Sequence, residues 1–159
     1  MKFTLSWLKD HLDTNKDLVT IVDTLTNIGL EIESVEDKSK DFNDFTVAEV
    51  LKAEKHPDAD RLKVCTVKSI DGTFQVVCGA HNAREGMKGI FAPENSFIPG
   101  TGVKLKKSKI RGVESCGMLV SEREMGISDE HDGIIEVDSK YLLGEKFIEV
   151  FNLDDPVMK

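Results

Sequence analysis

Cysteine is scarce in this chain, and the three cysteines present exclude a disulfide framework. Cys65, Cys78 and Cys116 make an odd number in 159 residues, whereas small disulfide-stabilised domains contain an even, paired set. Each lies in an apolar, strand-like run, where a free thiol acts as a small hydrophobic side chain. Cys78 and His81 have the spacing of a zinc-ligand pair, but no second closely spaced pair completes a site, so we expect no bound metal.

Long hydrophobic runs are also missing. No apolar stretch approaches the roughly 18 residues that cross a membrane, and the charged residues Lys9, Asp10 and Asp13 interrupt the amino-terminal apolar segment, which argues against a secretory signal. With 40% hydrophobic and 31% charged residues, the composition is typical of a soluble globular protein. We therefore expect a cytoplasmic protein without a membrane partner.

Motifs of common catalytic sites are absent as well. The sequence contains no glycine-rich phosphate loop, no serine nucleophile elbow and no zinc-protease motif. The acidic residues around His131 are typical of a solvated loop. We expect the chain to be non-catalytic by itself and to bind no cofactor.

A short basic segment contrasts with the overall acidity. The formal net charge is −8, yet residues 86–118 contain six basic and two acidic residues, so this segment has a charge of +4 and the remainder −12. Because salt screens charge over about 8 Å, a phosphate near the segment would respond mainly to the local charge. Five of the basic residues fall within eight positions: Lys104, Lys106, Lys107, Lys109 and Arg111.

The apolar residues among these lysines predict one bent strand. Val103 and Leu105 alternate with lysines, and the next apolar residue, Ile110, has the opposite phase. A bulge at Lys106 and Lys107 would place both apolar sets inside a small barrel. Lysines can also simply protect a solvated edge strand, which is the alternative reading of this segment.

Turn and helix signals follow the basic segment. Gly112 and Gly117 suit a tight return of the chain. Ser121 and Glu124 have the S-x-x-E spacing of a capping box, which predicts a short helix ended by Gly126.

The remaining pattern predicts a mainly β protein with a small helical flank. Residues 1–39 are expected to form a short helix near Trp7, a helix from Leu18 to Ile28 and a strand over 30–35. Residues 38–44 are polar and aperiodic and are expected to be a linker. Asp71-Gly72 predicts a hairpin turn. Short strands are expected over residues 45–53, 62–69, 74–78, 89–92, 103–110, 117–120 and 134–137, which favours a small β-barrel.

Several of these strings resemble the tRNA-binding domain found in phenylalanyl- and methionyl-tRNA synthetases and in free-standing tRNA-binding proteins. The strings are HPDADRLKVCTV (56–67), FQVVCGAHNAREG (74–86), FIPG (97–100) and KIRGVESCGMLVSERE (109–124). Two positions depart from the family pattern, because His81 replaces the usual proline and Ala83 the frequent valine. The resemblance implies an OB-fold β-barrel that binds tRNA.

The first 39 residues are similar to a narrower family. MKFTLSWLKDHLD (1–13) and IGLEIESVED (28–37) resemble the amino terminus of bacterial phenylalanyl-tRNA synthetase beta subunits. That resemblance implies three segments: residues 1–39 begin a discontinuous first domain of helix and strand, residues 40–150 form the inserted OB domain, and residues 151–159 return to the first domain. We expect the remainder of that first domain to lie beyond the sequence given.

The resemblance also implies partners. The ligand would be tRNA, specifically tRNA(Phe), and the subunit partner would be the alpha subunit of an (alpha-beta)2 heterotetramer. The whole phenylalanine–tRNA ligase uses ATP and magnesium, but neither is expected to bind this segment.

The expected tRNA contacts are mainly the basic residues. Lysines and arginine can neutralise phosphates without reading bases, which suits a folded tRNA backbone. Only 6% of residues are aromatic, and none lies between Phe97 and Tyr141, so base stacking on the basic segment is not expected. The predicted tRNA-binding residues are Lys104, Lys106, Lys107, Lys109, Arg111, Asn82, Ser115 and Ser121.

Some alternatives remain open. Ser121 can be only a helix cap and Asn82 only a turn residue. His56, Pro57 and the aspartates at 58 and 60 are expected to form a turn in which carboxylates accept backbone amides. The whole barrel can also serve assembly of the synthetase rather than tRNA binding, or belong to a free-standing tRNA-binding protein.

Overall fold

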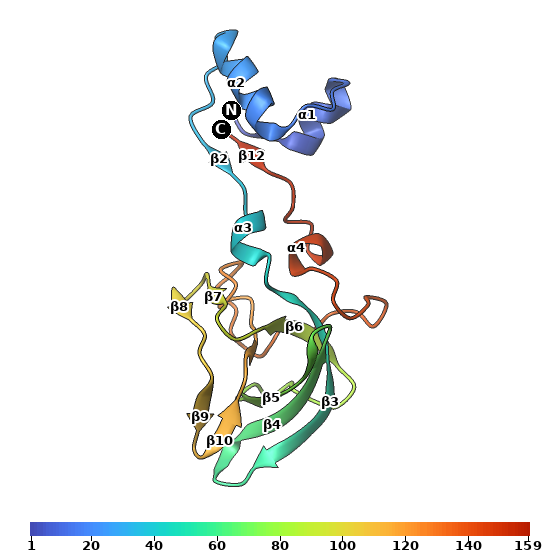
Figure 1. Cartoon of the computed structure of the whole chain (residues 1–159), viewed down its shortest axis with the longest axis vertical. Helices are drawn as coiled ribbons and strands as arrows, with labels where there is room; N and C mark the ends of the chain where they lie inside the picture. Colours follow the sequence, from blue (N-terminus) through green and yellow to red (C-terminus); the bar gives the residue numbers. More distant parts are fainter.

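The computed structural model describes residues 1–159 as a mainly β protein with a larger β part and a smaller part built from both chain ends (Figure 1). The larger part contains a five-stranded antiparallel sheet in the order β11-β6-β3-β4-β5. Its strands are β3 (Thr46–His56), β4 (Ala59–Ser69), β5 (Gly72–Cys78), β6 (Lys88–Ala92) and β11 (Met118–Leu119).

The predicted hairpin between the second and third long strands is confirmed, with its turn one residue earlier than the predicted Asp71-Gly72. Ser69 pairs with Gly72, so Ile70 and Asp71 form a two-residue loop. Gly72 has a φ of +137°, a conformation that few other residues adopt without strain.

The segment between β6 and β11 forms two short ribbons instead of one bent strand. One ribbon pairs β7 (Phe97–Ile98) with β8 (Val103–Lys104), and the other pairs β9 (Ser108–Ile110) with β10 (Val113–Ser115). The expectation of a single basic strand with Val103 in the core is therefore wrong. Val103 is 56% exposed, because the β7–β8 ribbon lies at the surface and the chain leaves the ladder before β9.

The sheet curls into an OB-like fold that is only partly closed. Its edge strands, β11 and β5, do not share a continuous ladder. They are bridged by the segment preceding β11, where the backbone N–H of Cys116 donates to the carbonyl of Gln75 (2.8 Å) and Val77 N–H donates to Ser115 Oγ (3.0 Å). The predicted OB fold is thus observed as a partly open barrel.

The core lies on both faces of β6. Phe91 belongs to the apolar cluster inside the curled sheet, with Val50, Val67 and Val76, whereas Ile90 belongs to a second cluster on the opposite face. Because neighbouring residues of a strand point to opposite faces, β6 is buried on both sides. β6, which lies between β11 and β3 in the sheet, therefore contributes to both apolar clusters.

The second cluster contains a short helix where a linker was expected. Residues 39–42 form α3 (Ser39–Phe42), and α4 (Phe147–Val150) lies beside it. Phe42 is 5% exposed and its ring meets that of Phe147 edge-on, with centroids 5.3 Å apart. The linker prediction for 38–44 is wrong in this respect, because the buried aromatic contact orders the segment.

The chain ends form the smaller part. β12 (Val157–Met158) pairs with both β1 (Phe3–Thr4) and β2 (Val35–Glu36). The two predicted helices are confirmed as α1 (Leu5–His11) and α2 (Leu18–Asn27), whereas the strand expected over 30–35 is reduced to β2. Pairing of the last residues with the first fits the expected discontinuous domain, whose boundaries remain a prediction.

None of the four helices has the length and apolar character needed to span a lipid bilayer.

A substitution at Gly117 would measure how tightly the edge of the barrel is packed. Its φ is +94°, and an added Cβ would lie 2.6 Å from the Phe91 ring and 2.7 Å from the Ala92 carbonyl. We expect Gly117→Ala to lower the free energy of unfolding by more than about 2 kcal/mol, as measured by urea denaturation. The matched control is Gly112→Ala, where φ is +85° but nothing lies within 4 Å, so backbone strain alone should cost about 1 kcal/mol. Equal losses would contradict the packing argument.

Candidate nucleic-acid interface

The β9–β10 hairpin places Arg111 at its tip. Ile110 pairs with Val113, so Arg111 and Gly112 form a two-residue turn, with φ values of +48° and +85°. Positive φ at both positions is the geometry of a type I′ hairpin turn, which suits glycine but costs a side-chain-bearing residue about 1 kcal/mol. The turn directs an arginine away from the sheet at the cost of local strain.

His56 holds this hairpin against the turn between β3 and β4. Its side chain is 4% exposed, Nε2 lies 2.9 Å from the Ile110 carbonyl, and Nδ1 lies 3.0 Å from the Asp58 backbone nitrogen. Because Nδ1 accepts from that amide, Nε2 must bear the proton that is donated to Ile110. The expected turn is present, but a histidine ring rather than a carboxylate accepts the Asp58 amide.

The contact joins the two loops that flank the ligand face of an OB fold. In such folds, oligonucleotides bind between the loop joining strands 1 and 2 and the loop joining strands 4 and 5. Here those loops are the β3–β4 turn and residues 93–117, which contain the basic segment. Sequence reasoning did not assign His56 this role, because its partner Ile110 is 54 residues away in the sequence.

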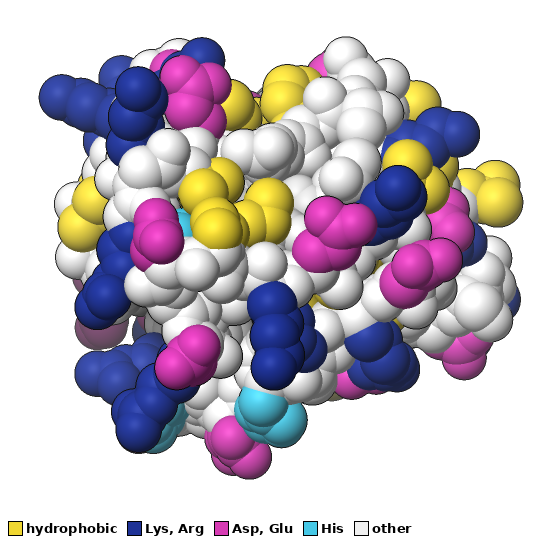
Figure 2. Space-filling model, turned by 90° about the horizontal axis from the view of Figure 1, so that it is seen from below, with side chains coloured by type: hydrophobic (Ala, Val, Ile, Leu, Met, Phe, Trp, Pro, Cys, Tyr) yellow, Lys and Arg dark blue, Asp and Glu magenta, His cyan; other side chains and the backbone are white.

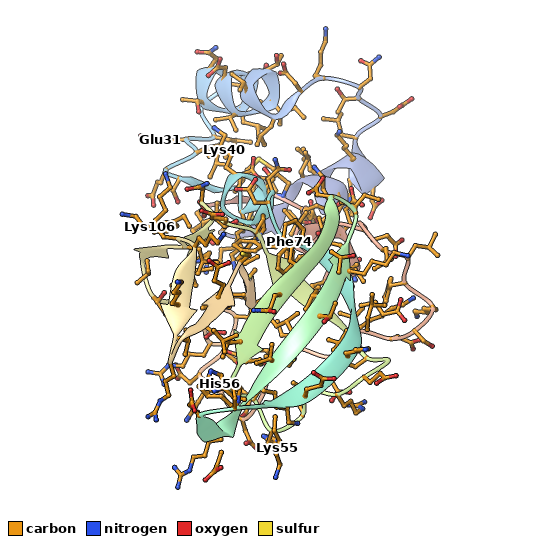
Figure 3. All side chains as sticks on the ribbon, turned by 60° about the horizontal axis from the view of Figure 1, so that its bottom comes forward. Glu31, Lys40, Lys55, His56, Phe74 and Lys106 are labelled. Atoms are coloured by element: carbon orange, nitrogen blue, oxygen red, sulfur yellow. The ribbon has the colours of Figure 1, made fainter.

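The five predicted basic residues are all exposed and lie along one side of the β part. Lys104 ends β8, Lys109 lies in β9, and Arg111 lies in the turn. Figure 3 shows Lys106 well away from Lys55 and His56, which lie near the β3–β4 turn.

One of these lysines is already paired. Lys107 Nζ lies 3.3 Å from Glu114 Oε2, and this hydrogen-bonded partner raises the pKa of Lys107. Lys104, Lys106, Lys109 and Arg111 take part in none of the ion pairs within 4 Å. Figure 2 shows Lys and Arg side chains interspersed with Asp and Glu on the face seen from below. On that face, positive and negative side chains are therefore mixed.

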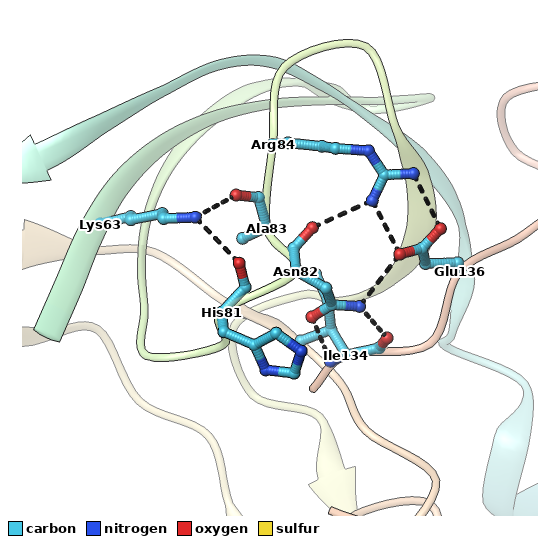
Figure 4. A network of polar contacts seen from close by, with 7 residues as sticks. All are labelled: Lys63, His81, Asn82, Ala83, Arg84, Ile134 and Glu136. Carbon is cyan, nitrogen blue, oxygen red and sulfur yellow. Dashed lines mark hydrogen bonds and ion pairs between the residues drawn. The ribbon is translucent and has the colours of Figure 1, made fainter. Parts of the chain in front are cut away.

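Asn82 is used inside the protein. Its amide Oδ1 accepts the Ile134 N–H (2.9 Å) and its Nδ2 donates to the Ile134 carbonyl (2.8 Å), so it mimics a strand partner (Figure 4). Lys63 Nζ donates to the Ala83 and His81 carbonyls at 2.6 and 3.1 Å and fixes the same loop. These bonds give Asn82 a structural role in its loop, and its contact with tRNA stays a prediction.

The two serines are also structural. Ser115 is 4% exposed, and its Oγ accepts the Val77 N–H and donates to the Gly117 carbonyl (3.4 Å). Ser121 is 8% exposed and forms the predicted capping box, in which its N–H and Oγ both donate to Glu124 Oε2 at 2.6 and 2.9 Å. The capped residues form a single hydrogen-bonded turn rather than a helix. Both hydroxyls thus have structural partners, and their contact with tRNA stays a prediction.

Other chemistry finds little support in the structure. No group of three or more His, Cys, Asp or Glu side chains is placed to hold a metal ion. Burial raises the pKa of Cys65 to about 11 and also raises that of Cys78, so both thiols remain protonated at neutral pH. These cysteines serve the core, as their apolar surroundings predicted.

Comparisons with known proteins identify the family. Residues 45–146 match the family described as "Putative tRNA binding domain". The phenylalanine–tRNA ligase beta subunit of Mesorhizobium japonicum is 55% identical over 161 residues, which cover 100% of this chain and 20% of that protein. The Brucella abortus beta subunit is 52% identical over 160 residues, with the same coverage. The chain thus spans about a fifth of the length of these curated relatives.

Among solved structures, a MetRS-related protein from Pyrococcus horikoshii is similar. It is 28% identical, with a TM-score of 0.47, and the match covers 64% of this chain and 86% of that one.

The ion pair between Arg84 and Glu136 should make the stability of the loop around Asn82 depend on pH. Arg84 binds Glu136 through both guanidinium nitrogens (2.7 and 2.9 Å), and this contact, with a smaller one from Asn82, lowers the pKa of Glu136 to about 2. A lowered pKa means that the ionised form stabilises the fold above pH 4.5, and that this stabilisation is lost as pH falls towards 2.

We expect Glu136→Gln to lower the free energy of unfolding at pH 7 by only about 0.5–1 kcal/mol, since the carboxylate is 44% exposed. The difference from wild type, measured by urea denaturation, should shrink between pH 4.5 and 2. Glu85→Gln, at an exposed position without an ion pair, should have no effect at either pH. A difference that persists at pH 2 would contradict the ion-pair explanation.

Proposed function

Because the chain belongs to the tRNA-binding domain family, we propose that it binds tRNA through phosphate contacts made by the basic residues between β8 and β10. The observation that supports this most directly is the position of Lys104, Lys106, Lys109 and Arg111. All four are exposed, form no ion pair, and lie in the loop region that an OB fold uses for oligonucleotides.

The mechanism follows from charge and shape. A folded tRNA presents a dense array of phosphates, while its A-form helices hide the base edges in a deep groove. When lysine and arginine side chains neutralise phosphates, the cations condensed on the RNA are released into solution. The resulting gain in entropy drives binding. Lys107 would contribute least, because Glu114 already neutralises it.

The setting of this module is also part of the proposal. The full-coverage similarity to beta subunits supports a place in a cytoplasmic phenylalanine–tRNA ligase, with tRNA(Phe) as ligand. An alpha subunit would complete an (alpha-beta)2 heterotetramer, and ATP and magnesium would act elsewhere in the enzyme. The division into residues 1–39, 40–150 and 151–159 is supported by the pairing of β12 with β1 and β2.

One observation favours an assembly role as the second candidate. Acidic and basic side chains alternate over the face in Figure 2, and several apolar side chains of the terminal part are exposed, among them Trp7, Leu12 and Val19. Such a surface suits contacts with neighbouring protein domains. The two candidates differ in their response to salt.

We expect Lys106→Gln/Lys109→Gln to weaken tRNA binding about tenfold at low salt, or about 0.7 kcal/mol per contact. The slope of log affinity against log salt should fall by about two, since each lost phosphate contact removes about one. Fluorescence anisotropy with labelled tRNA at a series of salt concentrations measures both quantities.

The matched control is Lys9→Gln/Lys16→Gln, which removes the same charge from the terminal part. It should leave the slope unchanged. Binding that ignores salt, or equal effects of the two double variants, would refute phosphate recognition by the basic segment and favour the assembly role.

A further inference from the structure

The β7–β8 ribbon brings an exposed aromatic ring next to the basic residues. Phe97 pairs directly with Lys104, and Ile98 pairs with Val103. Ile98 is 1% exposed and Ser96 2% exposed, whereas Phe97 between them is 54% exposed. The alternation of a strand therefore anchors the ribbon through Ser96 and Ile98 and leaves the Phe97 ring in solvent.

Phe97 differs from the other aromatic residues of the β part. The rings of Phe42, Phe45, Phe91 and Phe147 are buried, and each contacts another aromatic ring. Phe97 is in none of the aromatic pairs. An exposed ring without an aromatic partner can gain binding energy when a planar group stacks on it.

A positively charged residue lies beside this ring. Directly paired residues of an antiparallel ribbon have Cβ atoms about 5 Å apart on the same face, so Lys104 lies beside Phe97. Lys106 follows two residues later, and the ribbon is extended by the bond from Leu105 N–H to the Ser96 carbonyl (2.8 Å). Glu94 accepts the backbone N–H of Lys107 (3.4 Å), and no acidic residue forms an ion pair with Lys104 or Lys106.

We propose that the β7–β8 ribbon is a subsite for one unpaired nucleotide of bound RNA. The base stacks on Phe97, and the adjoining phosphates contact Lys104 and Lys106. A base inside an A-form helix cannot expose its face to a side chain, so the ligand must be a single-stranded loop or end. This inference rests on the proposed tRNA binding and adds to it a position at which bases, and not only phosphates, are held.

Charge complementarity is the reason for preferring RNA to a protein partner here. A purely apolar partner would leave Lys104 and Lys106 desolvated without compensation, whereas a nucleotide satisfies both the ring and the ammonium groups. The sequence did not predict this subsite, because Phe97 lies before the basic residues in the chain. Only the pairing of β7 with β8 brings it beside Lys104.

The test compares Phe97→Leu with Phe97→Tyr in the 159-residue chain. Binding of a single-stranded oligouridylate and of a duplex RNA of equal length is measured at the same low salt. Leucine keeps an apolar side chain but loses the π face, so single-strand affinity should fall about fivefold to a hundredfold, while tyrosine should retain it. Duplex binding should change less than twofold, and Val19→Ala, which alters an exposed apolar residue of α2, should change neither. Thermal unfolding confirms that each variant is folded.

A second readout uses fluorescence. In a Trp7→Phe background, Phe97→Trp introduces the only tryptophan, and a stacked base should quench its emission when oligouridylate is added. No quenching at saturating RNA would overturn the subsite.

The outcomes separate this inference from the proposed function. If the lysine variants weaken RNA binding but Phe97→Leu does not, the subsite is refuted and tRNA binding through phosphates stands. If the wild-type chain shows no salt-dependent RNA binding, the proposed function itself fails. If Phe97→Leu changes only self-association in sedimentation, the ribbon is a protein contact and the subsite is refuted.

Discussion

A few long-range hydrogen bonds hold the basic segment in place, because that segment contributes little to the core. Residues 93–117 leave the sheet after β6 and return to it at β11, and most of their side chains are exposed. His56 binds the Ile110 carbonyl, Gln75 donates to the Glu114 carbonyl (2.8 Å), and the Cys116 amide binds Gln75. The position of the basic segment therefore depends on these hydrogen bonds between the barrel and the β9–β10 hairpin. The barrel residues that form them, His56 and Gln75, lie on β3 and β5.

This arrangement explains why polar residues near the interface are structural. An OB-like barrel that is only partly closed leaves backbone groups of β5 without strand partners, and such groups must be satisfied when they are buried. Ser115 binds the Val77 amide, and Asn82 completes the backbone pairing of Ile134. These side chains supply hydrogen bonds that a strand partner would otherwise supply, which is why the proposed phosphate contacts are assigned to the exposed lysines and Arg111.

Local signals were enough to predict many of the elements. The helix at Leu18–Asn27, the hairpin before Gly72 and the capping box at Ser121 are each encoded within a few residues. Non-local contacts decided the rest. Phe42 orders a polar segment only because Phe147 lies against it, and Val103 alternates like a core residue although its ribbon lies at the surface.

The same limit applied to the site. The basic residues could be found from composition alone, because charge is visible in the sequence. The hydrogen-bond partners of Ser115 and Asn82 could not be found in this way, since Val77 and Ile134 are far from them in the sequence. The pairing of Phe97 with Lys104 likewise depends on the register of a ribbon.

The three-stranded sheet of the chain ends has a mechanical consequence. Since β12 lies between β1 and β2, the polypeptide enters and leaves the β part through two connections that run side by side, near α3 and α4 (Figure 1). Two chain connections that lie side by side resist rotation of the barrel, whereas a single linker would allow free rotation about its axis. The two connections therefore limit rotation of the barrel relative to the terminal part. An RNA bound on the basic side of the barrel would then have a limited range of orientations relative to the rest of the molecule.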